Sequence, residues 1–112
     1  MFTLRTPEME ASYQGREKTD VCPMCSAPPL EDWKYWKIAK NNYPYDLVAE
    51  KHDLLILKEH TEKISRNAWI EFNESKYALQ DAPYSYHAII ENLPVRQSFP
   101  AHFHYHLLRY KP

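Results

Sequence analysis

Three histidines near the end of the chain, His102, His104 and His106, are spaced so that they could act together. They alternate with apolar residues at Ala101, Phe103, Tyr105 and Leu107. Successive side chains of a β-strand point to opposite faces, so this spacing predicts a strand with one histidine face and one apolar face. Such a row can provide a metal ligand, a nucleophile and an orienting group, since imidazole suits all three roles. The alternative is a half-buried strand whose histidines face water.

Both cysteines lie in one short motif, Cys22-Pro-Met-Cys25. A thioredoxin-like redox pair would open a helix, but Ser26-Ala-Pro-Pro29 follows and resists helix formation. A tight turn that presents two thiolates to zinc fits better, because zinc takes four ligands and the chain has histidines to complete the set. A redox pair and two buried cysteines without a ligand remain as alternatives.

The composition excludes several classes of protein. With 112 residues, 14 Lys and Arg and 15 Asp and Glu, the chain is a single nearly neutral domain, which predicts neither a nucleic-acid nor a membrane surface. Its one glycine rules out a P-loop and a GxGxxG turn. The N-terminal residues lack the pattern of a signal peptide, and no apolar run has transmembrane length, so we expect a cytoplasmic protein.

The elements that must position these residues follow from hydrophobic patterning. Thr61 is the expected N-cap of one main helix that ends near Asp81, and Pro83 follows it. The histidine strand should lie inside the sheet, with this helix over its apolar face. Residues 1–20 are expected to be a flexible arm and residues 21–112 the domain. Strands are predicted over 33–39, 52–57, 84–92 and the histidine row, which gives an α+β fold with an antiparallel sheet.

The row His102-Phe-His104-Tyr-His106-Leu-Leu resembles the His-φ-His-φ-His-φ-φ signature of the histidine triad superfamily, in which φ is apolar. Lys58-Glu-His60 resembles the Lys-x-His element of that superfamily. Asn92 with Gln97 and Ser98 is similar to its phosphate-contacting segment. Asn41-Asn-Tyr-Pro44 looks like the Asn-x-Tyr-Pro turn of the galactose-1-phosphate uridylyltransferase branch. The resemblance spans residues 22–110 and implies an antiparallel sheet of about five strands with one main helix.

The resemblance also implies a function. It predicts an enzyme, a nucleotide phosphohydrolase or nucleotidyltransferase, in which His104 forms a covalent nucleotidyl intermediate and His106 assists. The implied partner is a nucleotide or nucleotide conjugate, with a homodimer as in many relatives. The implied substrate-binding residues are Asn41, Asn92, Gln97 and Ser98, and the implied ligands of a structural zinc ion are Cys22, Cys25, His60 and His102.

The segment before the triad departs from the family pattern. Both glycines of the family segment are missing, and Leu93-Pro-Val-Arg96 stands in their place. Arg96 or Arg109 could compensate through its guanidinium group. The missing glycines favour an alternative, a zinc-stabilised nucleotide-binding or interaction module with little or no turnover. A catalytic metal held by all three triad histidines is a third reading, and the cysteine pair argues against it.

The remaining histidines lie outside the signature. His52 and His87 are therefore expected at the surface or at an edge of the sheet. The nucleobase, the leaving group and the acceptor are not specified by the sequence.

Overall fold

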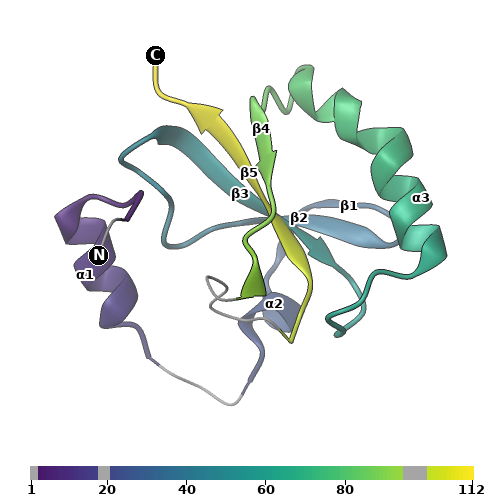
Figure 1. The fold of residues 1–112 in the computed structure, drawn as a ribbon, viewed down its shortest axis with the longest axis horizontal. Helices are drawn as coiled ribbons and strands as arrows, with labels where there is room; N and C mark the ends of the chain where they lie inside the picture. The colour runs from purple at the N-terminus through teal and green to yellow at the C-terminus, as the bar shows by residue number, and fades with distance from the viewer. Residues whose placement is uncertain (1–2, 18–20, 95–100) are drawn as a thin grey trace.

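The chain folds around a five-stranded antiparallel sheet (Figure 1). The computed structural model describes residues 3–17, 21–94 and 101–112. The strands are β1 (Pro29–Asp32), β2 (Trp36–Lys40), β3 (Ala49–Leu57), β4 (Ala88–Ile90) and β5 (His104–Tyr110), in the order β1-β2-β3-β5-β4. The helices are α1 (Pro7–Gln14), α2 (Pro23–Ser26), α3 (Arg66–Ser75) and the 3₁₀ helix η1 (Lys76–Gln80). The predicted α+β fold, with about five strands and one main helix, is confirmed.

The histidine strand β5 lies inside the sheet, between β3 and β4, as its alternating pattern predicts. His104 pairs with Ile56, and His106 pairs with Leu54. The strand begins at His104, so His102 lies just before it rather than on it. The intervening Phe103 donates its backbone N–H to the Thr61 carbonyl at 2.8 Å. The row therefore bends before the strand, which lets His102 leave the line of the other two histidines.

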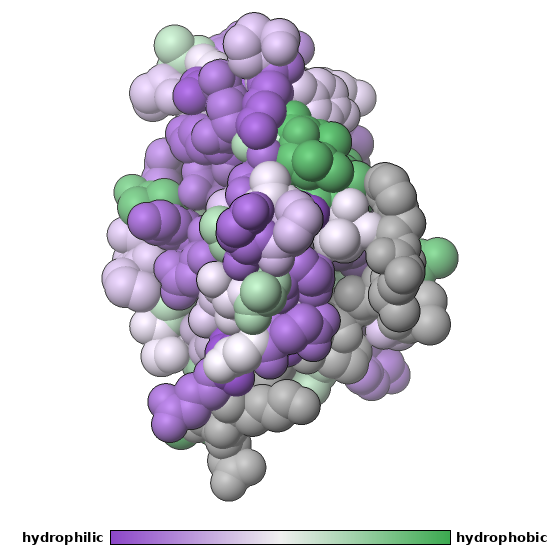
Figure 2. Space-filling view, turned by 90° about the vertical axis from the view of Figure 1, so that its left-hand side faces the viewer, coloured by the Kyte–Doolittle hydropathy of each residue, from purple (hydrophilic) through white to green (hydrophobic). Residues whose placement is uncertain are grey.

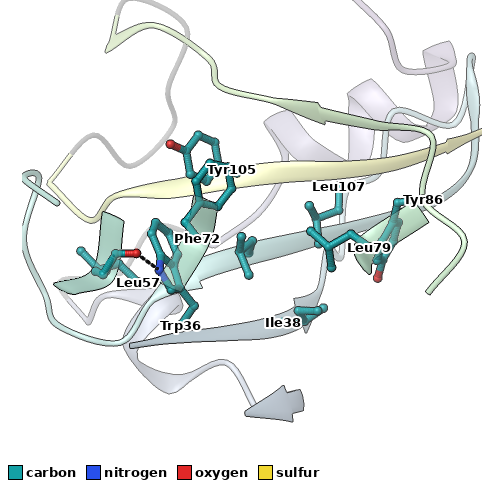
Figure 3. Close-up of a cluster of buried hydrophobic side chains, with 10 residues drawn as sticks. Trp36, Ile38, Leu57, Phe72, Leu79, Tyr86, Tyr105 and Leu107 are labelled. Atoms are coloured by element: carbon teal, nitrogen blue, oxygen red, sulfur yellow. Dashed lines mark hydrogen bonds between the residues drawn. The ribbon is translucent and has the colours of Figure 1, made fainter. Parts of the chain in front are cut away.

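The main helix covers the apolar face of the sheet (Figure 3). The Trp36 indole N–H donates to the Ala68 carbonyl at 2.9 Å, and the Phe72 and Tyr105 rings stack with centroids 4.5 Å apart. Burying each large apolar side chain contributes about 1.5–3 kcal/mol. The core on this face consists of Trp36, Ile38, Leu55, Leu57, Ala68, Phe72, Leu79, Tyr86, Tyr105 and Leu107. The expected apolar face of the histidine strand is thus confirmed.

Short segments cover the other face of the sheet, which carries the histidines. Met24 and Ala27, in and just after α2, pack against a small cluster formed by Ala39, Leu54 and Ile56. A second cluster joins Tyr45, Ala49 and Leu108 to Leu4 of the N-terminal segment, together with Val48 and Ile90. These segments offer less apolar cover than α3 does, which leaves room for polar side chains between them.

The N-terminal segment differs from the flexible arm that the sequence analysis expected. Helix α1 starts after Thr6, whose side chain accepts a hydrogen bond from the Met9 N–H. Thr6 also donates its N–H and its hydroxyl to the Asp46 carboxylate, both at 2.8 Å. Thr6 followed by Pro7 is a signal for the start of a helix, and the expectation of a flexible arm, which was based on the polar composition of residues 1–20, overlooked it. The side of the molecule that α1 occupies is mostly hydrophilic, with one larger hydrophobic patch and several smaller ones (Figure 2).

The main helix begins four residues later than predicted. Its N-cap is Ser65, whose hydroxyl accepts from the Ala68 N–H at 3.2 Å. Thr61 instead accepts backbone hydrogen bonds outside the helix, from Phe103 at its carbonyl and from Lys63 at its hydroxyl. The end of the helical region at Asp81 agrees with the prediction.

Two other boundaries differ from the prediction. Strand β1 was not predicted, and β4 is only three residues long, where a strand over 84–92 was expected. The Tyr86 N–H bonds back to the Leu79 carbonyl at 2.9 Å, so the start of this stretch is tied to η1, whereas the His87 N–H donates to the Leu108 carbonyl of β5 at 2.7 Å. None of the helices in the described part of the chain combines the length and the apolar character needed to cross a membrane.

Candidate metal centre and histidine site

The four predicted metal ligands converge on one point of the histidine face. Cys22 and Cys25 come from the turn of α2, His60 follows β3, and His102 precedes β5. One ligand atom from each of the four lies within 4.8 Å of the others. These residues are close enough to hold a metal ion.

Four of the distances between the ligand atoms are close to those found around a tetrahedral ion. Nδ1 of His102 lies 3.2 Å from Nδ1 of His60, 3.4 Å from the Cys22 sulfur and 3.5 Å from the Cys25 sulfur. The Cys25 sulfur lies 3.2 Å from Nδ1 of His60. Metal bonds of about 2.0–2.3 Å at tetrahedral angles place neighbouring ligand atoms about 3.3–3.8 Å apart. The four distances lie near this range, and all four ligand atoms lie within 4.8 Å of one another.

A backbone carbonyl orients His102 for this role. Nε2 of His102 lies 2.5 Å from the Leu57 carbonyl oxygen, which can only accept, so Nε2 carries the proton. Burial lowers the pKa of His102, although the Leu57 carbonyl raises it. The neutral ring then has its lone pair on Nδ1, the atom that faces the other three ligands. His102 is fully buried, so its ring cannot turn toward water.

The middle histidine has the opposite tautomer. Nδ1 of His104 lies 2.9 Å from the His102 carbonyl oxygen and donates its proton to it. Burial lowers the pKa of His104, so the ring is neutral near pH 7 and its lone pair is on Nε2. The peptide unit of His102 therefore fixes the ring of His104, while the side chain of His102 belongs to the metal cluster.

His52 is buried, contrary to the expectation that it lies at the surface or at an edge of the sheet. Nδ1 of His52 accepts the Tyr45 backbone N–H at 2.9 Å, so its proton is on Nε2. That Nε2 lies 2.8 Å from Nδ1 of His106 and donates to it. His106 in turn carries its own proton on Nε2, because a neutral imidazole has one N–H. A backbone amide thus sets the tautomers of two histidines in succession.

The side-chain amide of Asn92 ends this series. It lies 3.1 Å from Nε2 of His106 and 2.7 Å from the Tyr45 hydroxyl. Because Nε2 of His106 is a donor, the amide must present its oxygen here; its nitrogen would place two donors against each other. Asn92 is one of the predicted substrate-binding residues, and its amide contacts the histidine network.

Burial keeps both histidines of this pair neutral. It lowers the pKa of His52 to about 4, and the Arg5 cation adds to the effect. Burial also lowers the pKa of His106 to about 3, with smaller contributions from His52, His104 and Arg5. Arg5 belongs to the N-terminal segment, where its guanidinium lies 3.9 Å from the centre of the Tyr13 ring and 5.0 Å from that of Tyr45.

Asn41 lies at the same end of the histidine face. Its side-chain oxygen accepts the Tyr43 N–H at 2.9 Å, a bond to the backbone two residues on that asparagine commonly makes in turns. Its side-chain nitrogen lies 3.1 Å from Nε2 and 3.4 Å from Nδ1 of His52. A role in substrate binding stays a prediction.

Other predicted residues do not join the site. Gln97, Ser98 and Arg96 lie outside the described residues. Arg109 cannot compensate for the missing glycines by binding a phosphate beside the histidines. It lies with Leu107 on the opposite face of β5 and pairs with Glu50 at 2.7 Å. His87 is exposed, as expected, and accepts the Tyr110 N–H at 3.0 Å.

Parity along β3 is the signal that could have identified His52. Positions 52, 54 and 56 share one face of the strand. Leu54 and Ile56 pair with His106 and His104, so that face is the histidine face. Parity along β2 likewise places Lys37 on this face, because Lys37 pairs with Ile56. Arg5 had no such signal, since it lies outside the sheet.

Comparison of the chain with protein-family models, curated proteins and solved structures finds no match in any of the three. The function is therefore inferred from the site alone.

Proposed function

We propose that the chain is an enzyme of the histidine triad type, a nucleotide phosphohydrolase or nucleotidyltransferase that works through His104. The observation that carries the proposal is the tautomer of His104. Its Nδ1 proton is held by the His102 carbonyl, so a buried, neutral ring offers the Nε2 lone pair. A neutral imidazole with a fixed orientation is a competent nucleophile near pH 7.

The reaction has two steps. In the first, Nε2 of His104 bonds to the α-phosphorus of a nucleotide ester or anhydride, and the bond to the leaving group breaks with its electron pair. In the second, the oxygen of water or of another acceptor bonds to the phosphorus and loses its proton to solvent, while the N–P bond breaks and returns its electron pair to Nε2. Splitting one displacement into two is the usual advantage of a covalent intermediate.

The neighbouring histidines take different roles. His106 keeps its proton on Nε2 because His52 donates to its Nδ1, so it is a hydrogen-bond donor suited to a phosphate oxygen and not a second nucleophile. The Nδ1 lone pair of His102 faces the cysteine cluster. Among the triad, His104 is therefore the residue with an available lone pair.

We further propose that the metal is zinc, held by Cys22, Cys25, His60 and His102. Two thiolates and two imidazoles at the observed spacing suit zinc. When bound, zinc supplies a cross-link between the N-terminal turn and the histidine strand, because four protein ligands leave no open position for water. The homodimer and the cytoplasmic location also stay predictions.

The test is incubation with radiolabelled nucleoside phosphoramidates, dinucleoside polyphosphates and nucleotide sugars, followed by trapping of labelled histidine. Substitution His104→Ala should lower turnover at least about a thousandfold and remove the label, with zinc content unchanged. His87→Ala is the matched control, since this exposed histidine lies outside the site. Full activity in the His104→Ala variant would show that the mechanism is wrong.

A second candidate is a zinc-stabilised nucleotide-binding or interaction module with little or no turnover. One observation favours it: both glycines of the family segment before the triad are absent. Nucleotide binding without turnover of any substrate in the panel would support this candidate over the enzyme.

A further inference from the structure

Lys37 connects the sheet to the turn that carries both cysteines. It lies on β2, where it pairs with Ile56, which in turn pairs with His104, so its side chain belongs to the histidine face. Its ammonium nitrogen lies 2.7 Å from the Ala27 carbonyl oxygen and 3.4 Å from that of Cys25. The side chain is half-buried. Lys37 thus donates to two carbonyls at the C-terminal end of α2.

Helix α2 has little internal stability. It is one turn of four residues, and its N-cap residue Cys22 makes no side-chain capping bond. The Ser26 hydroxyl bonds only weakly within the turn, at 3.4 Å to the carbonyls of Cys22 and Pro23. The last carbonyls of a helix lack intrahelical partners, and a lysine is a favourable donor to them. Without a hydrogen-bond donor from outside, few interactions within α2 stabilise this conformation of the turn.

The two contacts place the ammonium group of Lys37 beside the cysteine turn. One of the accepting carbonyls belongs to Cys25, itself one of the four ligand residues, and the other belongs to Ala27, which packs against the histidine face. An ordinary solvated lysine would not be expected to contact the turn twice. Both hydrogen bonds therefore link the sheet to the segment that carries the cysteines.

We propose that Lys37 is a positioning residue of the metal centre, which holds the cysteine turn against the sheet in the geometry that binds metal. The inference rests on the proposed zinc site and adds a residue that the ligand motif does not contain. Residues that orient metal ligands typically change metal affinity 10–100-fold when they are mutated.

The experiment measures zinc affinity of the full chain by competition with a chromogenic chelator. Substitution Lys37→Met keeps the aliphatic stem but removes the ammonium group, and it should weaken zinc binding about 10- to 100-fold. Lys37→Arg should restore most of the affinity, because the guanidinium can still donate to the carbonyls. Lys40→Met is the matched control. Lys40 lies on the same strand but is exposed, so the zinc affinity of this variant should equal that of the wild type.

Two further measurements separate positioning from loss of fold. The Co²⁺ form of Lys37→Met should keep the absorption bands of the wild type, because the four ligands are unchanged. In the metal-free chains, amide exchange at residues 24–27 should be faster in Lys37→Met than in the wild type, while β2 and β3 stay protected.

The outcomes distinguish this inference from the proposed function. Zinc affinity of Lys37→Met within twofold of the wild type, or equal amide exchange in α2, would overturn the role of Lys37 alone. A wild-type chain that binds no zinc would overturn the proposed metal centre, and the role of Lys37 with it.

Discussion

The histidine face has two ends that satisfy the same kind of side chain in different ways. At one end, His60 and His102 meet two cysteines, and the atoms that come together are two ring nitrogens and two sulfurs. At the other end, His52 and His106 form a hydrogen-bonded series that starts at the Tyr45 backbone N–H and ends at Asn92. On the proposed function, a cation completes the first end, whereas the contacts described at the second end are between protein groups.

The difference shows that the backbone partner of a histidine decides what its ring can do. The Leu57 carbonyl accepts a hydrogen bond from Nε2 of His102 and leaves the Nδ1 lone pair facing the cysteines. The His102 carbonyl accepts a hydrogen bond from Nδ1 of His104 and leaves the lone pair on Nε2. A backbone N–H does the reverse to His52 and makes its Nε2 a donor. All three residues are histidines, so the residue type does not distinguish their roles.

If the proposed metal is bound, its loss should have the largest effect, and only at the end that carries the cysteines. Substitution Cys22→Ser removes a ligand, and because metal binding contributes to folding, it should lower the free energy of unfolding by roughly 5 kcal/mol or more. The measurement is urea unfolding together with metal analysis of the purified chain.

The control for this prediction is His87→Gln, which changes an exposed histidine and should alter neither stability nor metal content. Equal stability of the wild type with and without a chelator would contradict the prediction and remove the distinction between the two ends.

The hydrogen-bonded end should make stability depend on pH. Burial lowers the pKa of His52 to about 4, against about 6.5 in an unfolded chain. The unfolded state therefore binds more protons between these values, so this contribution is complete above pH 6.5 and is lost as the pH falls toward 4. Substitution His52→Gln can accept from Tyr45 and donate to His106 without titrating. Between pH 7 and pH 5 the wild type should lose about 2 kcal/mol more than this variant.

Urea unfolding of both chains at pH 7 and pH 5 measures this difference, and the subtraction removes the contribution of the metal ligands, which both chains share. Parallel pH dependence in the two chains would mean that His52 is charged or exposed in solution.

A single hydroxyl at this end should have the smallest effect. Substitution Tyr45→Phe removes the group 2.7 Å from the Asn92 amide but keeps the ring, which stacks on His106 with centroids 5.3 Å apart. Loss of one hydrogen bond of this kind costs about 1 kcal/mol. Thermal unfolding measures the cost, and unchanged zinc content checks that the metal end is independent. A chain that loses zinc on this substitution would show that the two ends are coupled.

The sequence predicts the parts of this molecule that are periodic. The alternation around Phe103 and Tyr105 predicts an interior strand with an apolar face, and the structure has that strand inside the sheet. The four metal ligands were predicted by resemblance, and they do come together. The first prediction depends on a strong local pattern, which tertiary contacts have little reason to override, and the second depends on the resemblance of separate short motifs to one family.

The predictions that differ from the structure concern positions where the local sequence signals are equal and tertiary contacts decide the outcome. Thr61 and Ser65 are both good N-caps, and Ser65 is used because the Thr61 carbonyl already accepts a hydrogen bond from Phe103, 42 positions along the chain. His52 precedes an apolar run that looks buried on both faces, so only its pairing partner reveals which face it shares. The substrate contacts of Gln97 and Ser98 lie outside the described residues and stay predictions.

His102 belongs to both sites: its ring faces the metal cluster and its carbonyl holds the proton of His104. On the proposed mechanism, an inhibition assay would therefore mislead. A chelator that removes the metal would free the ring of His102 and so disturb the backbone carbonyl of the same residue, which orients His104. Turnover would then stop, as if the ion itself took part in the reaction. Exchange of zinc for cobalt or cadmium is the informative assay, since a scaffold ion can be replaced with little change in rate, whereas an ion that activates water cannot.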